Sequence, residues 1–299
     1  MSKLECVLPA AAALGECPRW DERRGKLWWV DIQAPALHGF DPKTGEDVKI
    51  DMPENIGCFS LTENGGFIAG MRTGIFLLDE HGKVVRKLCD NPENPATSRF
   101  NDGRCDARGR FWLGTLDEPK AGNNAGLYRY DSRAVSGKDA LVRVDAGLLT
   151  SNGMAFSPDN RYCYHSDTPR FTIYRHTLDI ETGEVGPRED WVKFTPSDTD
   201  RGRPDGASVD SEGYYWAALY EGGRIARISP EGKVVEEHAL AARCPTMCAF
   251  GGDDLRTLYV TTARKGRPDD EIARYPQSGG VFAMRVPVPG LVEPRSNAA

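Results

Sequence analysis

A recurring phrase of strands and turns constrains the fold more than any other feature of this sequence. Each copy contains a short apolar strand, a turn with Asp or Asn followed by Gly, an aromatic-rich strand, and a third strand that ends in a polar turn. Six copies begin near Pro18, Cys58, Asn101, Asn152, Asp205 and Pro245. Their starts lie about 40 to 53 residues apart, the period of a four-stranded propeller blade. The sequence therefore predicts an all-β fold, a six-bladed β-propeller with four antiparallel strands in each blade.

The repeat also accounts for the length of the chain. At 299 residues the chain exceeds a typical domain of about 100 to 200 residues. No composition shift or linker interrupts the six copies, so we expect a single domain over residues 1–299. No window sustains a 3.6-residue apolar period over three turns, and we therefore expect almost no helix.

Charge and hydropathy exclude several classes of partner. The net charge of −6 gives no basic footprint for nucleic acid or an anionic membrane. No apolar run approaches the roughly 18 to 20 residues of a membrane span, and Lys3 is followed at once by Glu5 and Cys6 rather than by a secretory h-region. Irregularly spaced cysteines without a CxxC pair imply no disulfides. We expect a cytoplasmic protein, and a monomer, because a closed propeller leaves only short, protected strand edges.

Polar residues stand just before the inner strand in four of the six copies, where the other copies have small or apolar residues. They are Glu16, Asn101, Asn152 and Asp205. Asn-Gly and Asp-Gly pairs taken singly are turn signals. Radial packing of blades, however, brings the starts of the inner strands together at the central channel. Two carboxylates and one or two amide carbonyls form an all-oxygen set that suits a hard divalent cation.

Several motifs resemble one known family, in order and over almost the whole chain. The sequence resembles the senescence marker protein/gluconolactonase/luciferin-regenerating family of regucalcin-like sugar lactonases. The motifs that carry the resemblance are Leu14-Gly15-Glu16-Cys17-Pro18-Arg19-Trp20, Ser98-Arg99-Phe100-Asn101-Asp102-Gly103, Ser151-Asn152-Gly153-Met154-Ala155, Pro204-Asp205-Gly206, Phe250-Gly251-Gly252, Tyr259-Val260-Thr261-Thr262-Ala263-Arg264 and Gly279-Gly280-Val281-Phe282.

The resemblance implies a six-bladed propeller and specific site residues. It implies one divalent metal ion bound by Glu16, Asn152 and Asp205, which could be Ca²⁺, Mg²⁺, Mn²⁺, Zn²⁺ or Fe²⁺. It implies that Arg99 and Asn101 bind substrate. An acidic residue after the next strand also touches substrate in some members, and Glu118 or Asp117 matches it here. Cys17 departs from the Gly or Ser that commonly follows the metal-binding Glu.

These residues suit the hydrolysis of a lactone, which is a cyclic ester. The reaction needs carbonyl polarisation, a delivered hydroxide and stabilisation of an oxyanion, all of which a divalent cation with bound water can supply. Asp205 would act as general base, as the resemblance implies, while Arg99 and Asn101 hydrogen-bond the sugar. The predicted function is metal-dependent hydrolysis of a sugar lactone, such as gluconolactone or a pentonolactone, to the aldonic acid.

Other readings of the sequence stay open. There is no Gly-x-Ser-x-Gly elbow, and none of the five histidines is evidently paired with a nucleophile; His165, beside Ser166 and Asp167, is interpreted as packed within a blade. The chain could instead be a non-catalytic calcium-binding or scaffold propeller, or a metal-dependent esterase or organophosphate hydrolase using the same site. We expect the tryptophans to fill the core between blades rather than to bind ligand; they are Trp20, Trp28, Trp29, Trp112 and Trp216.

Overall fold

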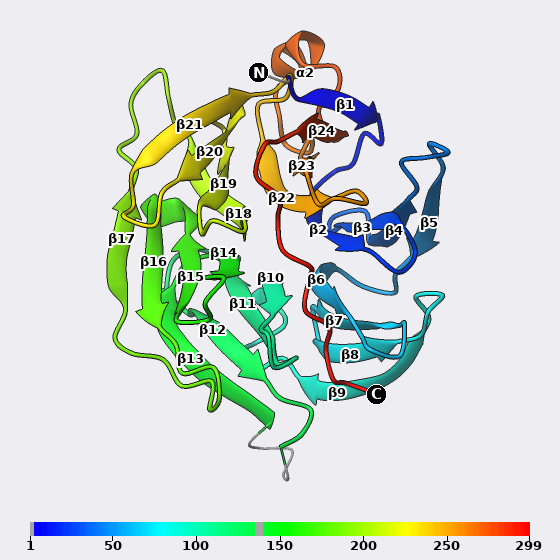
Figure 1. The fold of residues 1–299 in the computed structure, drawn as a ribbon, viewed down its shortest axis with the longest axis vertical. Coiled ribbons are helices and arrows are strands. Elements are labelled where there is room, and N and C mark those ends of the chain that lie inside the picture. Colours follow the sequence, from blue (N-terminus) through cyan, green and yellow to red (C-terminus); the bar gives the residue numbers. More distant parts are fainter. Residues whose placement is uncertain (1–2, 135–139) are drawn as a thin grey trace.

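The computed structural model describes residues 3–134 and 140–299. The described residues form six four-stranded sheets, each antiparallel, arranged around a common centre (Figure 1). Blade 1 comprises β2 (Gly15–Asp21), β3 (Lys26–Asp31), β4 (Ala36–Phe40) and β5 (Asp47–Asp51). Blade 2 comprises β6 (Ile56–Leu61), β7 (Phe67–Met71), β8 (Gly74–Leu78) and β9 (Val84–Asp90). Blade 3 comprises β10 (Ser98–Cys105), β11 (Phe111–Asp117), β12 (Ala125–Tyr130) and β13 (Leu141–Leu148).

The second half of the chain repeats the pattern. Blade 4 comprises β14 (Ser151–Phe156), β15 (Tyr162–Asp167), β16 (Thr172–Thr177) and β17 (Glu189–Lys193). Blade 5 comprises β18 (Arg203–Val209), β19 (Tyr215–Tyr220), β20 (Arg224–Ile228) and β21 (Val234–Ala239). Blade 6 combines β22 (Pro245–Gly251), β23 (Thr257–Thr262) and β24 (Val281–Arg285) with the N-terminal β1 (Glu5–Leu8).

The ring is closed by hydrogen bonds between the two ends of the chain. Strand β1 pairs antiparallel with β24, so the first strand completes the last blade (Figure 1). The described residues contain a 3-10 turn, η1 (Thr168–Arg170), and a short helix, α2 (Asp269–Arg274). These findings confirm the predicted all-β, six-bladed architecture and the near absence of helix. Among the described residues, no helix has the length and apolar character needed to cross a bilayer.

A repeated Asp–Trp pair shows why the recurring phrase folds as it does. In blade 3, Asp106 caps the turn before β11 by accepting from the backbone N–H groups of Arg108 and Arg110, and its other oxygen accepts from Trp112 Nε1 at 2.8 Å. In blade 5, Asp210 likewise accepts from Trp216 Nε1 at 2.9 Å. One carboxylate thus fixes both the turn and the aromatic-rich strand behind it.

The tryptophans named above are all buried, as predicted. Trp29, Trp112 and Trp216 are at most 1% exposed, and Trp20 and Trp28 are nearly so. Their rings pack against residues of their own and adjacent blades, for example Trp28 edge-on to Phe67 and Trp112 edge-on to Phe156. The hydrophobic core therefore lies between blades rather than in the channel.

The ladder between the first two strands is irregular at the same point in every blade. The register shifts occur between Glu16 and Arg19, Ile56 and Cys58, Phe100 and Gly103, Asn152 and Ala155, Pro204 and Ala207, and Pro245 and Met247. A bulge of this kind bends the strand and turns a side chain away from the sheet face. The six inner strands contact one another in ring order, so the bulges meet around the channel.

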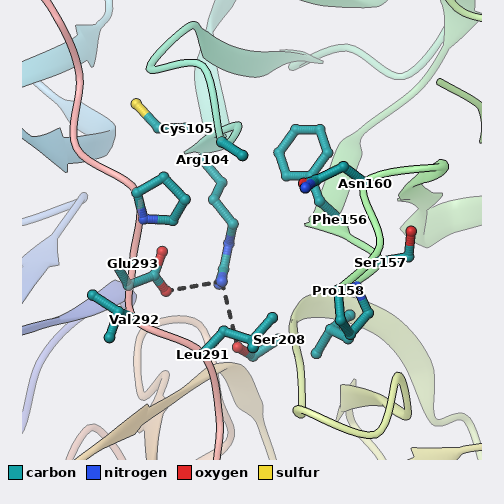
Figure 2. Close-up of a pocket in the computed structure, with 13 residues that line it drawn as sticks. Arg104, Cys105, Phe156, Ser157, Pro158, Asn160, Ser208, Leu291, Val292 and Glu293 are labelled. Atoms are coloured by element: carbon teal, nitrogen blue, oxygen red, sulfur yellow. Dashed lines mark hydrogen bonds and ion pairs between the residues drawn. The ribbon is translucent and has the colours of Figure 1, made fainter. Parts of the chain in front are cut away.

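The C-terminal segment, residues 286–299, crosses the centre of the ring (Figure 1). It bridges Asp210 of blade 5 and Thr62 of blade 2, through Gly290 and Ser296 respectively. Glu293 of this segment forms an ion pair with the buried Arg104 at 2.8 Å, beside a cavity of about 240 Å³ (Figure 2). Arg104 lies near the end of β10, so this segment covers one end of the channel.

Candidate active site

The starts of the inner strands converge at the other end of the channel. There a cavity of about 230 Å³ is lined by Glu16 of blade 1, Arg99 and Asn101 of blade 3, Asn152 of blade 4 and Asp205 of blade 5. All five side chains are at least nine-tenths buried. At the corresponding position blade 2 has Gly57, where an added Cβ would lie 2.0 Å from the Phe100 carbonyl oxygen. The structure thus brings together the residues that the repeat predicted to meet.

A chain of hydrogen bonds orients the amide side chains. Arg99 Nη1 donates to Asn101 Oδ1 at 2.7 Å, and Asn101 Nδ2 donates to Asn152 Oδ1 at 2.6 Å. Asn152 Nδ2 then donates to Thr168 Oγ1 at 2.8 Å, and that hydroxyl donates to the Pro204 carbonyl at 2.8 Å. Because both the nitrogen and the oxygen of the Asn152 amide have partners, its orientation is defined, and the oxygen keeps a second lone pair that could accept a cation.

The two carboxyl groups of the cavity hold their protons unusually tightly in the metal-free protein. Burial raises the pKa of Asp205 to about 8, with repulsion from the Asp102 carboxylate adding to the effect. Burial also raises the pKa of Glu16 well above its ordinary value, and Asp205 and Asp102 raise it further. The guanidinium of Arg99 opposes both shifts, and burial lowers its own pKa to about 10.

These features fit a site for a hard divalent cation. Asp205 Oδ1 is buried and has no hydrogen-bond partner among the described residues. Two buried carboxyl groups that repel each other, one with an unpartnered oxygen, are costly unless a cation compensates them. The donor set of Glu16, Asn152 and Asp205 offers only oxygen, which Ca²⁺, Mg²⁺ and Mn²⁺ prefer.

A second group of possible ligands lies between blades 3 and 4, outside the cavity. His165 Nε2 is 3.1 Å from His176 Nε2 and 3.2 Å from Asp145 Oδ2. Asp145 also pairs with Arg188 at 3.0 Å, and this guanidinium would repel a cation bound there. His165 is fully buried within its blade, in agreement with the interpretation from the sequence.

The acidic residues predicted after β11 are both near the site but make other contacts. Glu118 forms a bidentate ion pair with Arg72, whose Nη2 lies 2.6 Å from Glu118 Oε1, and Arg72 rather than Arg99 dominates the lowered pKa of Glu118. Asp117 is buried and accepts from the Gly122 backbone N–H at 3.1 Å. Neither residue lines the cavity directly.

Cys17 points away from the cavity. Its φ of 50° is in the left-handed region, where the bulge of β2 turns the chain. The buried Sγ lies 3.4 Å from the Phe59 backbone nitrogen in blade 2, and burial raises the pKa of the thiol to about 11. The residue that departs from the family pattern therefore packs between blades 1 and 2 as a neutral thiol.

The cavity also contains residues that sequence reasoning missed. Arg203, Lys120 and Tyr220 line it together with Thr168. One signal for Arg203 was available, since Arg203 precedes Asp205 by two positions as Arg99 precedes Asn101. Alternate residues of a strand share a face, so both arginines point to the same side as the polar residue that follows them. Lys120 lies in a loop and had no such signal.

Comparison with known proteins agrees with this architecture. Residues 14–264 match the SMP-30/Gluconolactonase/LRE-like region. The chain is 49% identical over 292 residues to a Pseudomonas putida protein named 6-deoxy-6-sulfogluconolactonase, covering 97% of each chain. It is 33% identical to Xenopus laevis regucalcin, covering 94% of each. The crystal structure of a calcium-binding protein, regucalcin, from Agrobacterium tumefaciens superposes with a TM-score of 0.91 at 26% identity, covering 98% of this chain and 97% of that one.

Fold and cavity together define a six-bladed propeller with a carboxylate-lined pocket at one end of its channel. With the match over residues 14–264, the chain belongs to the SMP-30/gluconolactonase/LRE-like family.

Proposed function

We propose that this protein hydrolyses a sugar lactone, such as gluconolactone or a pentonolactone, to the aldonic acid, with one divalent cation in the cavity described above. The enzyme class is that of the family, a hydrolase that opens the ester bond of a lactone. The observation that carries the proposal is the meeting of Glu16 and Asp205, two buried carboxyl groups with raised pKa values, beside the hydrogen-bonded series from Arg99 to Asn152.

The residues divide into cation ligands and substrate ligands. Glu16, Asn152 and Asp205 would hold the cation through their oxygen atoms. When bound, the cation supplies polarisation of the lactone carbonyl and lowers the pKa of coordinated water. The calcium-binding neighbour supports Ca²⁺ as one candidate, along with Mg²⁺, Mn²⁺, Zn²⁺ and Fe²⁺.

The chain's own groups provide positioning and proton transfer. Arg99 can donate through Nη2 to the ring hydroxyls or to the carbonyl oxygen, because its Nη1 is held by the Phe100 carbonyl and Asn101 Oδ1. Asn101 can accept from a sugar hydroxyl through Oδ1, since its Nδ2 already donates to the Ser151 carbonyl and to Asn152 Oδ1. Asp205 would accept the proton of the attacking water as its carboxylate, the form that a bound cation favours over the protonated carboxyl. The Glu118 carboxylate lies close enough to Arg99 to raise the pKa of its guanidinium. Glu118 is therefore a candidate contact for the distal part of the substrate.

The Pseudomonas putida relative supports a particular lactone. At 49% identity over nearly the whole chain, its name makes the six-carbon 6-deoxy-6-sulfogluconolactone the first substrate to test. We also propose that residues 1–299 form one domain and that the protein is a cytoplasmic monomer. The pairing of β1 with β24 closes blade 6 and removes an open sheet edge, which supports the monomer.

The experiment is a proton-release assay on chelator-treated protein. D-glucono-1,5-lactone, D-xylono-1,4-lactone and 6-deoxy-6-sulfogluconolactone are added before and after Ca²⁺, Mg²⁺, Mn²⁺, Zn²⁺ or Fe²⁺ is restored. We expect hydrolysis above the spontaneous rate only with a restored cation. Folded protein that accelerates none of these lactones with any cation would refute the proposal and favour a binding propeller.

A further inference from the structure

The lining of the cavity carries more positive charge than a neutral sugar lactone requires. Its acidic residues are Glu16 and Asp205, and its basic residues are Arg99, Lys120 and Arg203. A divalent cation would balance the two carboxylates, and Glu221 pairs with Arg203 at 2.9 Å, which leaves the charges of Arg99 and Lys120 without a carboxylate partner among the described residues. Hydroxyl groups are bound well by neutral donors and acceptors, so a local excess of positive charge favours an anionic ligand.

Arg203 is held in position and keeps a donor free. Its Nη2 lies 2.9 Å from Glu221 Oε2, and its guanidinium lies 5.1 Å from the centre of the Tyr220 ring. Glu221 also contacts Arg267 at 2.8 Å, and Arg267 has a second carboxylate partner in Glu271 at 2.7 Å. The Nε of Arg203 is buried and has no partner among the described residues. A buried donor of this kind is costly unless a ligand or water accepts from it.

Arg203 and Arg99 line the cavity from equivalent positions of two blades. In the strand ladder of blade 5, Arg203 lies opposite Tyr220, and in that of blade 3, Arg99 lies opposite Leu116. The two arginines therefore occupy equivalent positions two blades apart. Arg99 points its guanidinium to Asn101. Arg203 pairs with Glu221 instead. The Arg99 guanidinium is therefore committed to the amide series, whereas Arg203 pairs with Glu221 and keeps its Nε without a partner among the described residues.

Lys120 completes the pair from the loop after β11. Its φ of 53° is left-handed, and its backbone N–H donates to the Asp117 carbonyl at 2.9 Å, so the turn that carries it is fixed. Its side chain is exposed and lines the cavity, and within residues 3–134 and 140–299 its ammonium forms no ion pair. The neighbouring Arg72 differs, because Glu118 neutralises it.

We propose that Arg203 and Lys120 form a subsite for a tetrahedral anionic substituent, a sulfonate or phosphate, on the exocyclic carbon of the lactone. This inference rests on the proposed lactonase function and deepens it by naming the residues that select a charged substrate. A planar guanidinium and a mobile ammonium are the two side chains that best bind such oxygens. The subsite lies in the same cavity as Glu16 and Asp205, so the anion and the reacting carbonyl would belong to one ligand.

The test compares neutral and anionic lactones on the same variants. The substrates are glucono-1,5-lactone, 6-phosphogluconolactone and 6-deoxy-6-sulfogluconolactone, and the variants are Arg203→Gln, Lys120→Gln and the double substitution. Loss of one charge-assisted hydrogen bond typically costs about 10- to 100-fold in binding. We expect kcat/KM for the anionic lactones to fall about 10- to 100-fold through KM, while that for glucono-1,5-lactone changes less than about 3-fold. Arg175→Gln, which removes an exposed ion pair with Glu189, is the matched control.

The outcomes separate the two proposals. If wild-type protein prefers no anionic lactone, or if Arg203→Gln lowers neutral and anionic turnover equally, the subsite is refuted while lactonase activity stands. A preference for phosphate over sulfonate, or the reverse, identifies the source of the anion. If no lactone is hydrolysed, calorimetry with 6-phosphogluconate and gluconate tests the subsite directly. The subsite proposal predicts that 6-phosphogluconate binds more tightly than gluconate and that Arg203→Gln loses this difference. Equal binding of the two compounds to wild type would overturn the subsite proposal.

Discussion

Replacing Asp205 by Asn should make the metal-free protein more stable while it abolishes turnover. Asp205 is buried, its Oδ1 has no partner among the described residues, and its pKa is raised to about 8. A carboxyl whose folded pKa lies above its unfolded value binds its proton more tightly in the folded state. The folded protein therefore loses stability as pH rises from the ordinary carboxyl pKa of about 4 toward 8. Asn has nearly the same shape and does not ionise.

The size of the effect follows from the shift. Each unit between the two pKa values corresponds to about 1.4 kcal/mol, so the roughly 3 units between the unfolded pKa and pH 7 amount to about 4 kcal/mol as an upper bound. We expect the free energy of unfolding of Asp205→Asn to exceed that of the metal-free wild type by about 2 to 4 kcal/mol at pH 7 and by much less at pH 5. A bound cation should remove the difference by compensating the wild-type carboxylate.

Urea denaturation with excess chelator at pH 5 and pH 7, repeated with Ca²⁺, measures this directly. Asp179→Asn is the control, because backbone N–H groups lower the pKa of that exposed carboxyl and give the opposite sign. The reasoning fails if metal-free wild type and Asp205→Asn show the same pH dependence of unfolding. It also fails if Asp205→Asn retains full lactone hydrolysis, since the same carboxyl is assigned the role of base.

Three further outcomes follow from the structure. Arg99→Gln should raise KM at least about 10-fold and change the affinity for the cation less than about 3-fold, because Arg99 hydrogen-bonds the amide of Asn101 rather than a carboxylate. Steady-state kinetics and metal titration measure the two effects. Glu293→Gln should destabilise the protein by about 3 to 5 kcal/mol without changing kcat, because it leaves Arg104 as an unpaired buried charge at the covered end of the channel; unchanged stability would contradict the assigned contact. Cation binding should release protons below pH 8 and strengthen as pH rises toward 8, because burial raises the pKa of Asp205 to about 8 and also raises that of Glu16. Calorimetry in buffers of different ionisation enthalpy would show the proton release, and pH-independent binding would count against these ligands.

The repeat in the sequence was sufficient to predict the fold and the main part of the cavity. Equivalent positions in successive copies meet at the channel, so Glu16, Asn101, Asn152 and Asp205 could be grouped without any knowledge of side-chain direction. The register shift at those positions explains why they point inward. Nothing in the local pattern distinguishes such a bulge from an ordinary turn, because Asn-Gly and Asp-Gly serve both.

Other features depended on contacts between distant parts of the chain. Residues 286–299 have no strand pattern, yet they cover one channel end through the pair of Glu293 with Arg104 (Figure 2). Likewise, Asp145 reaches His165 and His176 only because the outer strand of blade 3 lies against the middle of blade 4. Lys120 enters the cavity through a loop whose course is set by Asp117. Periodicity carries no information on such placements.

The most direct test of the central claim is a Mn²⁺ titration of chelator-treated protein in which bound metal and lactone hydrolysis are followed in the same sample. Wild type and His176→Gln, which alters the histidine cluster between blades 3 and 4, are compared with Glu16→Gln. The cavity assignment predicts that about one equivalent of Mn²⁺ restores hydrolysis in wild type and in His176→Gln, and that Glu16→Gln shows neither tight binding nor restored turnover. Full restoration in Glu16→Gln, or its loss in His176→Gln, would contradict a catalytic cation held by Glu16, Asn152 and Asp205.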